Sequence, residues 1–435
     1  MSTSLLACLA GLSKELGDYW SSTTTGAGST TTLVDSALIA KTNDWLTDEA
    51  YAFLIEEPAS TAAIYDERKA TGLVASTGIL TTLAFSEAPG TGIDYELHRL
   101  FSPSEKRRAL VSAAASIYPS LFKEIWDESQ VSGNWLKDGS LEIWTSATAL
   151  TYWTTSASTL AQTSTAGLFK HGLYSCKIST AAGYIQQSIT NFDDLKRLAG
   201  KTVTFTVQGW CDTASCLRIS IYDGVNDETY SDYHDGDSAW TEDRYPLEVT
   251  QTIDDNPTEI TFKIYHALEA ASETTYVDDA RVISDYRGKL YIGNLGLAQN
   301  RPHQVFIEPN DYSQEEDWLR VNGYKIDKDG YIYIPTTYPS DYRLRIRGIG
   351  YLDFLASGVS STAWTATIEL DEPQIKILTA QAAVYLYTWM SMPNYESGTR
   401  GDYQQMIGFW EDQLSRRKLQ FHMKSPPATV DWGIY

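Results

Sequence analysis

Between Trp135 and Ile283 the chain combines many tryptophans and tyrosines with aspartates and asparagines. A flat aromatic ring stacks on the apolar face of a sugar ring, and nearby carboxylates and amides hydrogen-bond the sugar hydroxyls. The candidate glycan-binding residues of this region are Trp144, Trp210, Tyr233, Trp240 and Asp223. The alternative is that these aromatic side chains fill a sandwich core or pack against another subunit.

A row of arginines forms a second candidate site. Arg343, Arg345 and Arg347 alternate with Leu344 and Ile346, so a strand here would place three guanidinium groups on one face. The chain has 34 basic and 56 acidic residues, for a formal net charge of -22. We therefore expect the row to pair with carboxylates of an adjacent subunit, with an ordinary solvated sheet face as the alternative. Two further candidates for inter-subunit contact, from the C-terminal region, are Trp389 and Trp410.

The cysteines and the known catalytic motifs argue against a metalloenzyme. The four cysteines have no paired CxxC or Cys/His spacing typical of zinc, and we expect thiols, with a Cys211–Cys216 bridge as the alternative. The chain has six histidines and no HExxH, and it lacks GxSxG, Walker and strand-to-helix GxGxxG motifs. A glycosidase needs two opposed carboxylates, which sequence cannot select from 56 acidic residues. We expect no catalysis and no cofactor.

The length and the charge limit the other function classes. A chain of 435 residues exceeds what one core usually supports, so two or three domains are expected. The strong negative charge disfavours a broad nucleic-acid footprint and would let DNA pass without sticking. No window approaches the length needed to cross a bilayer, and the N-terminal residues lack a cationic stretch before an apolar run. We expect a soluble protein with no membrane contact and no export signal.

The flanking segments combine short strands with helices. Leu5, Leu9 and Leu12 have helical spacing, and the Gly/Ser/Thr-rich stretch 23–38 predicts an extended arm or loop. Ser102, Pro103 and Glu105 spell a capped helix start, and Pro119 predicts two connected helical pieces ending near residue 126. Two further helices are predicted near the C-terminus, over about 375–389 and 403–414.

The middle segment alternates apolar and polar residues with the period of a strand. The clearest runs are 203–207, 217–221 and 260–264, separated by Asp/Gly/Asn turns, which favours a two-sheet sandwich. The predicted fold class is therefore α+β multidomain. It has three parts: an N-terminal α+β part with the arm over 1–134, an inserted all-β, jelly-roll-like sandwich over 135–285, and C-terminal strands, two helices and a docking tail over 286–435.

The strings GLYSCKI, VTFTVQGW, LRISIYDG and TTYVDDARVI of the middle segment resemble the galactose-binding, jelly-roll type of carbohydrate-binding module. The resemblance implies a sugar-binding fold. It also implies a cation near the ends of the sandwich, with Asp278, just before the last strand, as the candidate ligand of a structural calcium ion.

The flanks resemble a different family. The string TTTGAGSTTTLVDSAL, the helix FSPSEKRRALVSAAASIYPSLF and the stretch 342–417 are similar to head-to-tail adaptors, or connectors, of tailed bacteriophages. The resemblance implies a non-enzymatic virion protein assembled in the host cytoplasm as a twelvefold or sixfold homo-oligomeric neck ring. Its partners would be portal and tail proteins, DNA would pass without sequence-specific binding, and the sandwich would face outward. The alternative is a carbohydrate-binding decoration or receptor-binding protein that recognises a host-surface glycan.

Overall fold

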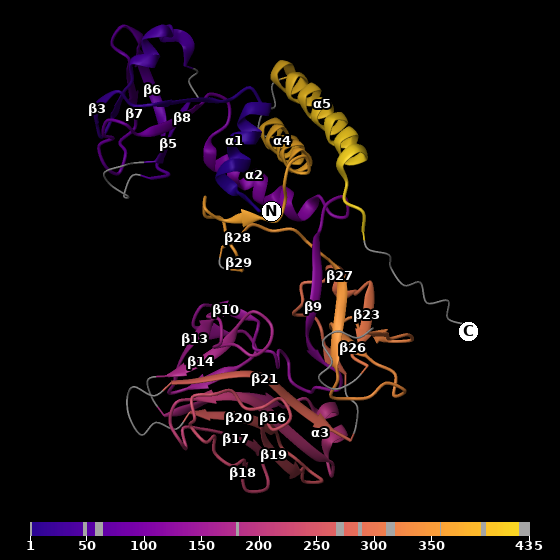
Figure 1. Ribbon diagram of the computed structural model, residues 1–435. Helices are drawn as coiled ribbons and strands as arrows, with labels where there is room; N and C mark the ends of the chain where they lie inside the picture. Colours follow the sequence, from indigo (N-terminus) through magenta and orange to yellow (C-terminus); the bar gives the residue numbers. More distant parts are fainter. Residues whose placement is uncertain are drawn as a thin grey trace. The chain divides into compact units, whose positions relative to one another are not determined.

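The computed structural model describes residues 2–46, 50–56, 64–179, 182–266, 274–285, 289–309, 318–356, 358–392 and 397–425 (Figure 1). The chain forms two compact units. The first is made of residues 1–123 and 351–424, and the second is built around residues 124–350. Among the described helices, none has the length and apolar character needed to span a bilayer.

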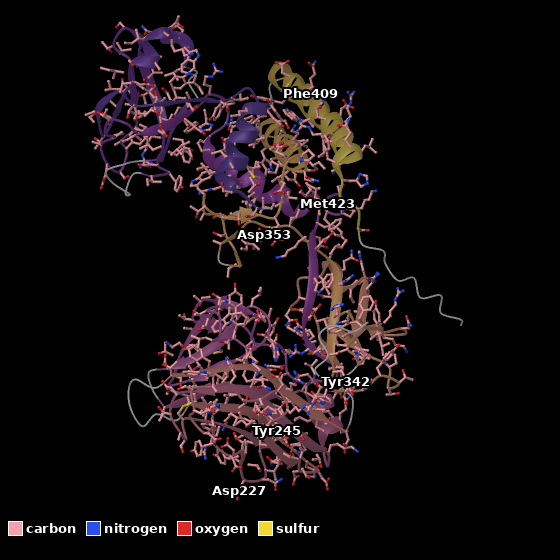
Figure 2. All side chains as sticks on the ribbon, viewed as in Figure 1. Asp227, Tyr245, Tyr342, Asp353, Phe409 and Met423 are labelled. Carbon is pink, nitrogen blue, oxygen red and sulfur yellow. A yellow bond between two sulfur atoms is a disulfide. The ribbon has the colours of Figure 1, made fainter. Side chains whose placement is uncertain are left out.

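Four helices of the first unit pack around one apolar core. They are α1 (Leu5–Glu15), α2 (Pro103–Ser116), α4 (Ile375–Ser391) and α5 (Ser397–Phe421). The predicted cap of α2 is confirmed, because the Glu105 N–H donates to the Ser102 hydroxyl and the Ser102 N–H donates to the Glu105 carboxylate. The two predicted C-terminal helices are also present. Phe409 of α5 is half exposed (Figure 2).

A seven-stranded sheet completes most of the first unit. Its order is β2 (Trp20–Thr23), β8 (Asp94–His98), β5 (Tyr51–Glu56), β6 (Glu67–Val74), β7 (Ile79–Thr82), β4 (Thr32–Val34) and β3 (Gly26–Ser29). The prediction of an extended arm or loop over 23–38 is therefore wrong. Leu33 pairs with Leu80 across β4 and β7, and both Leu33 and Leu38 are fully buried. Their apolar side chains hold this segment in the sheet despite its Gly/Thr-rich composition.

Strand β1, near the N-terminus, joins strands from residues 355–368 in a small sheet of the first unit. Its order is β1 (Thr3–Ser4), β30 (Thr367–Ile368), β28 (Leu355–Ala356) and β29 (Val359–Ser360), with Thr3 opposite Ile368. Residues 1–123 and 351–424 thus share one compact unit.

The predicted second helical piece after Pro119 is wrong. Helix α2 ends at Ser116, and Lys123–Val131 forms strand β9 of the second unit's four-stranded sheet. The order of that sheet is β24 (Leu319–Arg320), β23 (Gln304–Ile307), β27 (Arg343–Gly350) and β9. Ile125 on β9 packs against an apolar cluster that includes Val305 and Leu344. This distant partner decides the strand conformation, which local helical spacing could not show.

The predicted sandwich is confirmed as two five-stranded antiparallel sheets. One has the order β12 (Thr154–Ser156), β15 (Gly183–Ile189), β20 (Ile260–His266), β17 (Leu217–Tyr222) and β18 (Thr229–Tyr230). The other has the order β13 (Thr159–Thr163), β14 (Ser175–Ser179), β21 (Thr274–Ser284), β16 (Thr202–Cys211) and β19 (Leu247–Thr252). Phe205 and Phe262 meet edge to face between them, with ring centroids 5.4 Å apart. Helix α3 (Phe192–Leu198) and the hairpin of β10 (Trp144–Ser146) and β11 (Ala149–Leu150) accompany the two sheets.

Strands thus outweigh helices in the described chain, and helices are concentrated in the first unit. The second unit also contains a three-stranded sheet with the order β22 (Leu290–Tyr291), β26 (Tyr331–Tyr333) and β25 (Lys325–Ile326). Tyr291 and Tyr331, from β22 and β26, stand next to each other with ring centroids 5.0 Å apart.

Candidate functional site

The outer face of the sheet that runs from β12 to β18 carries tyrosines and cations. Side chains alternate between the core and this face, so Ile185, Ile219 and Ile264 are buried while their neighbours point outward. We name this surface the tyrosine face and define it by Tyr184, Tyr222, Tyr230, Tyr233, Tyr265, Arg218 and Lys263. Register brings three of them into one row, because Tyr265 lies between Tyr184 on β15 and Arg218 on β17.

Glu228 fixes the hydroxyl ends of this face. Its carboxylate accepts hydrogen bonds from the Ser220 hydroxyl at 2.5 Å, the Tyr265 hydroxyl at 2.8 Å and the Tyr230 hydroxyl at 2.9 Å, and it pairs with Lys263 at 3.2 Å. Burial opposes ionisation, but these hydrogen bonds outweigh it and lower the pKa of Glu228. Burial and the bond to Glu228 raise the pKa of Tyr265 to about 12. The tyrosine hydroxyls are therefore donors at neutral pH, and their rings are held in place.

Two cations lie against the tyrosine rings. The Arg218 guanidinium carbon is 4.0 Å from the ring centroid of Tyr230 and 4.8 Å from that of Tyr233. The Lys263 ammonium is 5.2 Å from the ring of Tyr184. Cation–π attraction at these distances restricts both the rings and the long basic side chains. The face is therefore preorganised for a ligand that presents both apolar patches and polar groups.

A pocket of about 580 Å³ adjoins the tyrosine face. Gln186 belongs to both surfaces, because it lines the pocket and lies opposite Lys263 in the sheet register. The far wall contains Tyr331 and Lys289, whose ammonium is 4.3 Å from the Tyr331 ring centroid and 3.4 Å from the Asp194 carboxylate. The pocket also presents the amide of Asn191. Rings, amides and charged groups thus continue from the sheet into the pocket.

Such a surface suits a saccharide chemically. Tyrosine rings offer flat apolar faces to C–H groups, while amides and charged groups exchange hydrogen bonds with hydroxyls. A pocket of this volume falls within the usual range for small-molecule sites.

The structure separates the five predicted glycan-binding residues. Tyr233 lies on the tyrosine face, beside Arg218. Trp144 is buried and donates from its indole to the Leu141 carbonyl. Asp223 is also buried, and it accepts backbone N–H bonds from three residues: Val225, Asn226 and Asp254. The predictions for Trp144 and Asp223 are wrong because both side chains are buried, where they stabilise packing and local turns.

Trp210 and Trp240 lie away from the tyrosine face. Trp210 is on β16 of the other sheet, where it pairs with Trp240 in a bridge and meets the Tyr276 ring at 5.2 Å. The Trp240 indole donates to the Gly167 carbonyl at 3.0 Å. The remaining tyrosines Tyr184, Tyr222 and Tyr265 of the surface were missed. The signal for them was present in GYIQQSI, LRISIY and ITFKIYH, whose polar alternate positions face away from the core.

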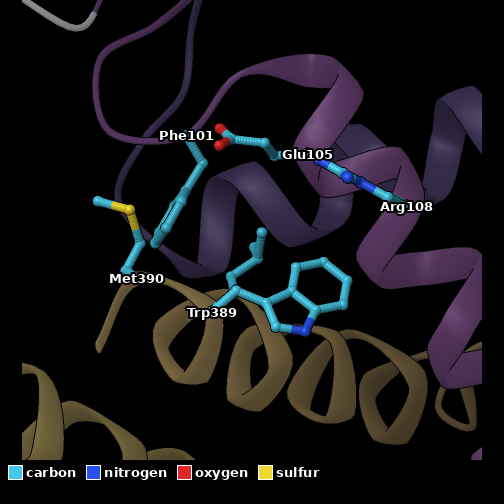
Figure 3. A pocket seen from close by; sticks show the side chains of 6 residues that line it. Phe101, Glu105, Arg108, Trp389 and Met390 are labelled. Carbon is cyan, nitrogen blue, oxygen red and sulfur yellow. The ribbon is translucent and has the colours of Figure 1, made fainter. Parts of the chain in front are cut away.

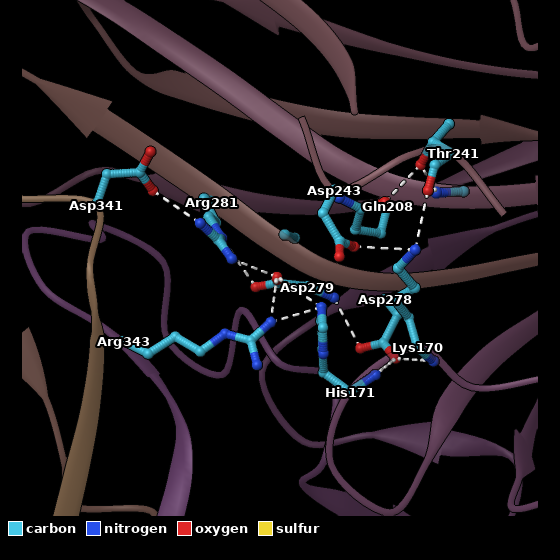
Figure 4. Close-up of polar contacts among 12 residues, drawn as sticks. Lys170, His171, Gln208, Thr241, Asp243, Asp278, Asp279, Arg281, Asp341 and Arg343 are labelled. Carbon is cyan, nitrogen blue, oxygen red and sulfur yellow. Dashed lines mark hydrogen bonds and ion pairs between the residues drawn. The ribbon is translucent and has the colours of Figure 1, made fainter. Parts of the chain in front are cut away.

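The predicted calcium ligand Asp278 is held by backbone donors (Figure 4). One carboxylate oxygen accepts from the N–H groups of Lys170 at 2.8 Å and His171 at 2.9 Å, and the other accepts from Asp279 at 2.7 Å. Burial raises the pKa of Asp278 well above its ordinary value. This is the environment of a carboxyl group bound by amides, so the described contacts do not themselves fit a calcium cage, and structural calcium stays a prediction.

Two of the four cysteines are not the thiols that the sequence predicts. Cys211 and Cys216 form a disulfide, whereas Cys8 and Cys176 are buried thiols. Within the described ranges, the ligand atoms of Cys211, Asp212 and Cys216 are the only group close enough to hold a metal. Because the two sulfurs are bonded to each other, neither is a free thiolate that could bind a metal ion.

The arginine row shares one strand face, as predicted. Leu344 and Ile346 are fully buried, and the three arginines between and beside them are partly exposed. Arg343 donates to His171 Nε2 at 2.6 Å and lies 4.0 Å from Asp279 (Figure 4). It therefore ties β27 to the sandwich, inside the same unit.

The other two arginines lie among aromatic rings. The Arg347 guanidinium carbon is 3.4 Å from the ring centroid of Trp126, whose side chain is 56% exposed. Arg345 is 4.2 Å from the Trp318 ring and pairs with Glu128 at 2.6 Å. We name Trp126, Trp318, Arg345 and Arg347 the arginine–tryptophan patch. The predicted pairing of this row with another subunit stays a prediction.

The two C-terminal tryptophans have different environments. Trp389 lines a pocket of about 340 Å³ with Phe101, Arg108 and Met390 (Figure 3). Its ring stacks on Tyr385 with the two planes only 5° apart. Trp410 is 4% exposed and belongs to the core of the first unit, so little of its ring is available to a second subunit.

Comparisons with solved structures give partial similarities, each of which covers less than half of this chain. No protein-family model and no curated protein sequence matches. A structure of TmCBM61 in complex with β-1,4-galactotriose is 14% identical, with 36% of this chain and 99% of that chain covered and a TM-score of 0.26. The CBM22-1 xylan-binding domain of Paenibacillus barcinonensis Xyn10C is 14% identical over 38% and 99%, with a TM-score of 0.26. The enzymatically active domain of bacteriophage CBA120 tailspike protein 4 is 11% identical over 35% and 21%, with a TM-score of 0.27.

Proposed function

We propose that the sandwich is a carbohydrate-binding unit whose ligand lies along the tyrosine face and enters the adjoining pocket. The observation that carries the proposal is the row of Tyr184, Tyr265 and Arg218, in which the Tyr265 hydroxyl is fixed by Glu228. Rigid rings reduce the entropy lost on binding, and the pocket supplies amides for the sugar hydroxyls. In this proposal the protein binds a glycan without cleaving it and needs no cofactor.

A glycan array probed with the full chain tests this proposal. Tyr265→Ala should abolish most of the signal, since it removes a ring, a hydroxyl donor and a contact of Arg218. The matched control is Trp210→Ala, a large aromatic truncation on the other sheet, which should leave the signal unchanged. Binding lost in Trp210→Ala and kept in Tyr265→Ala would place the site where the sequence interpretation put it.

The second candidate function is assembly into a virion neck ring, which one observation favours. The exposed Trp126 ring and the stacked Arg347 combine the two residue types that most often dominate protein interfaces. In this proposal the arginine–tryptophan patch contacts an acidic surface of another copy, the ring joins portal and tail proteins in the virion, and the sandwich binds a host-surface glycan from outside. The net negative charge of the chain would let DNA pass through the ring.

Negative-stain images of the purified full chain test assembly independently of glycan binding. Twelvefold or sixfold rings support the neck role. Trimers or monomers would contradict it, and would leave a carbohydrate-binding decoration or receptor-binding protein.

A further inference from the structure

Arg218 is a cation without an ion-pair partner among the residues that the structure describes, in a chain with 22 more acidic than basic residues. Its neighbours are rings instead: Tyr230, Tyr233 and Tyr265, with the guanidinium carbon 4.0, 4.8 and 5.6 Å from the three centroids. Two other cations of the face and pocket do form ion pairs. Lys263 pairs with Glu228, and Lys289 pairs with Asp194. The tyrosine face therefore keeps one positive charge unneutralised at its centre.

The tyrosine rings leave the hydrogen-bonding capacity of this guanidinium in place. Its five N–H donors lie in the plane of the group, so contact with ring faces does not use them. Two parallel N–H groups match the two oxygens of a carboxylate, which gives a short, charge-assisted, bidentate contact. The three rings also restrict the side chain before the ligand arrives, so less entropy is lost in forming that contact.

A second cation without an ion-pair partner among the described residues lines the adjoining pocket. Lys137 is exposed, lines the 580 Å³ pocket and places its ammonium 5.1 Å from the Tyr291 ring. No carboxylate partner of Lys137 occurs in the described part of the chain. Counting the charged side chains of the face and pocket, four cations (Lys137, Arg218, Lys263, Lys289) meet two carboxylates (Asp194, Glu228), an excess of two.

We propose that the glycan of this site is acidic, a saccharide that carries carboxylate groups such as those of uronic acid residues, and that Arg218 binds a carboxylate. The inference rests on the proposed function of the tyrosine face. A chain of net charge -22 repels polyanions in general. Binding of an acidic polymer must therefore depend on a local site, and a single substitution there should weaken it strongly.

The test compares two forms of one polymer with the full chain. The ligands are polygalacturonate and the same polymer after reduction of its carboxyl groups to primary alcohols, and the measurement is affinity by titration calorimetry at fixed salt. The wild type should bind polygalacturonate at least tenfold more tightly than the reduced polymer. Arg218→Gln should weaken binding of polygalacturonate about tenfold to hundredfold, because it removes a charge-assisted contact. Arg218→Lys should lie between, since a lysine keeps the charge and loses the bidentate geometry.

The control is Arg244→Gln, which removes an exposed arginine in the loop before β19 and should leave both affinities unchanged. Circular dichroism of each variant checks the fold. Equal affinity for the two polymers, unaffected by Arg218→Gln, would overturn the acidic-ligand inference and leave the tyrosine face as a neutral glycan site. Absence of binding to both polymers and to a neutral glycan panel would overturn the proposed function and this inference with it.

Discussion

Lys106 Nζ lies 2.8 Å from Asp18 Oδ2, and both side chains are almost completely excluded from solvent. The Asp18 carboxylate also accepts backbone N–H bonds from Leu100 and Phe101 at 3.0 Å each. Lys106 donates to the Ser13 hydroxyl at 3.0 Å. This one ion pair therefore joins the end of α1, the segment after β8 and the first turns of α2.

Breaking this buried pair should destabilise the first unit. Asp18→Ala leaves a buried ammonium and the backbone N–H groups of Arg99, Leu100 and Phe101 without their acceptor, and we expect a loss of about 3–5 kcal/mol in the free energy of unfolding. Hydrogen exchange of peptides from α2, followed through guanidinium unfolding, measures it. The control is Lys123→Gln, which removes the more exposed pair with Glu369 and should change stability by about 1 kcal/mol or less. Equal effects of the two variants would contradict a structural role for Asp18.

His171 should make the second unit less stable in acid. Burial and the Arg343 charge lower the pKa of His171 to about 4, while the unfolded chain has the ordinary value of 6.5. At pH values between 4 and 6.5, His171 is mostly protonated in the unfolded chain and mostly neutral in the folded chain. The contribution of His171 to the free energy of unfolding is therefore fully present above about pH 6.5. It is lost as the pH falls toward 4, by about 3 kcal/mol in total.

Replacing His171 with glutamine isolates this effect. Glutamine keeps a neutral acceptor for Arg343 and does not titrate, so the His171→Gln variant should lose less stability between pH 6.5 and 4 than the wild type. Urea unfolding at several pH values, read by hydrogen exchange of peptides from β27, gives the comparison. His422→Gln, at an exposed position, is the control. An unchanged pH dependence in His171→Gln would show that other groups cause the acid sensitivity.

Local patterns predicted those features that depend on neighbours in sequence. The alternation in Val203, Phe205 and Val207 gave a buried strand face, and Ser102 with Glu105 gave the cap of α2. The alternation of Leu344 and Ile346 likewise placed the arginines on one side of β27. In each case a period or a short motif determines the local geometry.

Features that depend on distant pairing were not predictable in the same way. Tyr184 and Tyr265 become neighbours only through the register of β15 and β20, and Trp126 meets Arg347 only because β9 joins the sheet of β27. Aromatic composition could not tell Trp144, which is buried, from Tyr230, which is 42% exposed. Of the five residues proposed from the sequence, the structure thus places only Tyr233 on the tyrosine face.

The arginine–tryptophan patch should matter for assembly and little for folding. Arg345→Gln with Arg347→Gln should weaken any homo-oligomer at least tenfold, because both guanidinium groups and the support of Trp126 are lost. Mass photometry over a concentration series measures this. The triple variant with Arg343→Gln should in addition lose stability, since Arg343 bonds His171 within the chain. An oligomer unchanged in the double variant would exclude the patch as its interface.

The disulfide predicts a specific pattern of cysteine modification. In protein unfolded without reductant, iodoacetamide should label Cys8 and Cys176 alone, whereas prior reduction should expose all four cysteines. Intact mass spectrometry distinguishes two adducts from four. Four adducts without reductant, from protein purified under air, would show that Cys211 and Cys216 remain thiols.

The location of the bound glycan tests the central claim most directly. Hydrogen exchange of the full chain, with and without a saturating glycan identified on the array, maps the site without any substitution. We predict slower exchange in peptides covering 183–191, 217–222 and 260–266, which form the tyrosine face and the adjoining pocket. Protection confined to 165–172 and 238–245, around Trp240, with no change at β15, β17 and β20, would contradict the account.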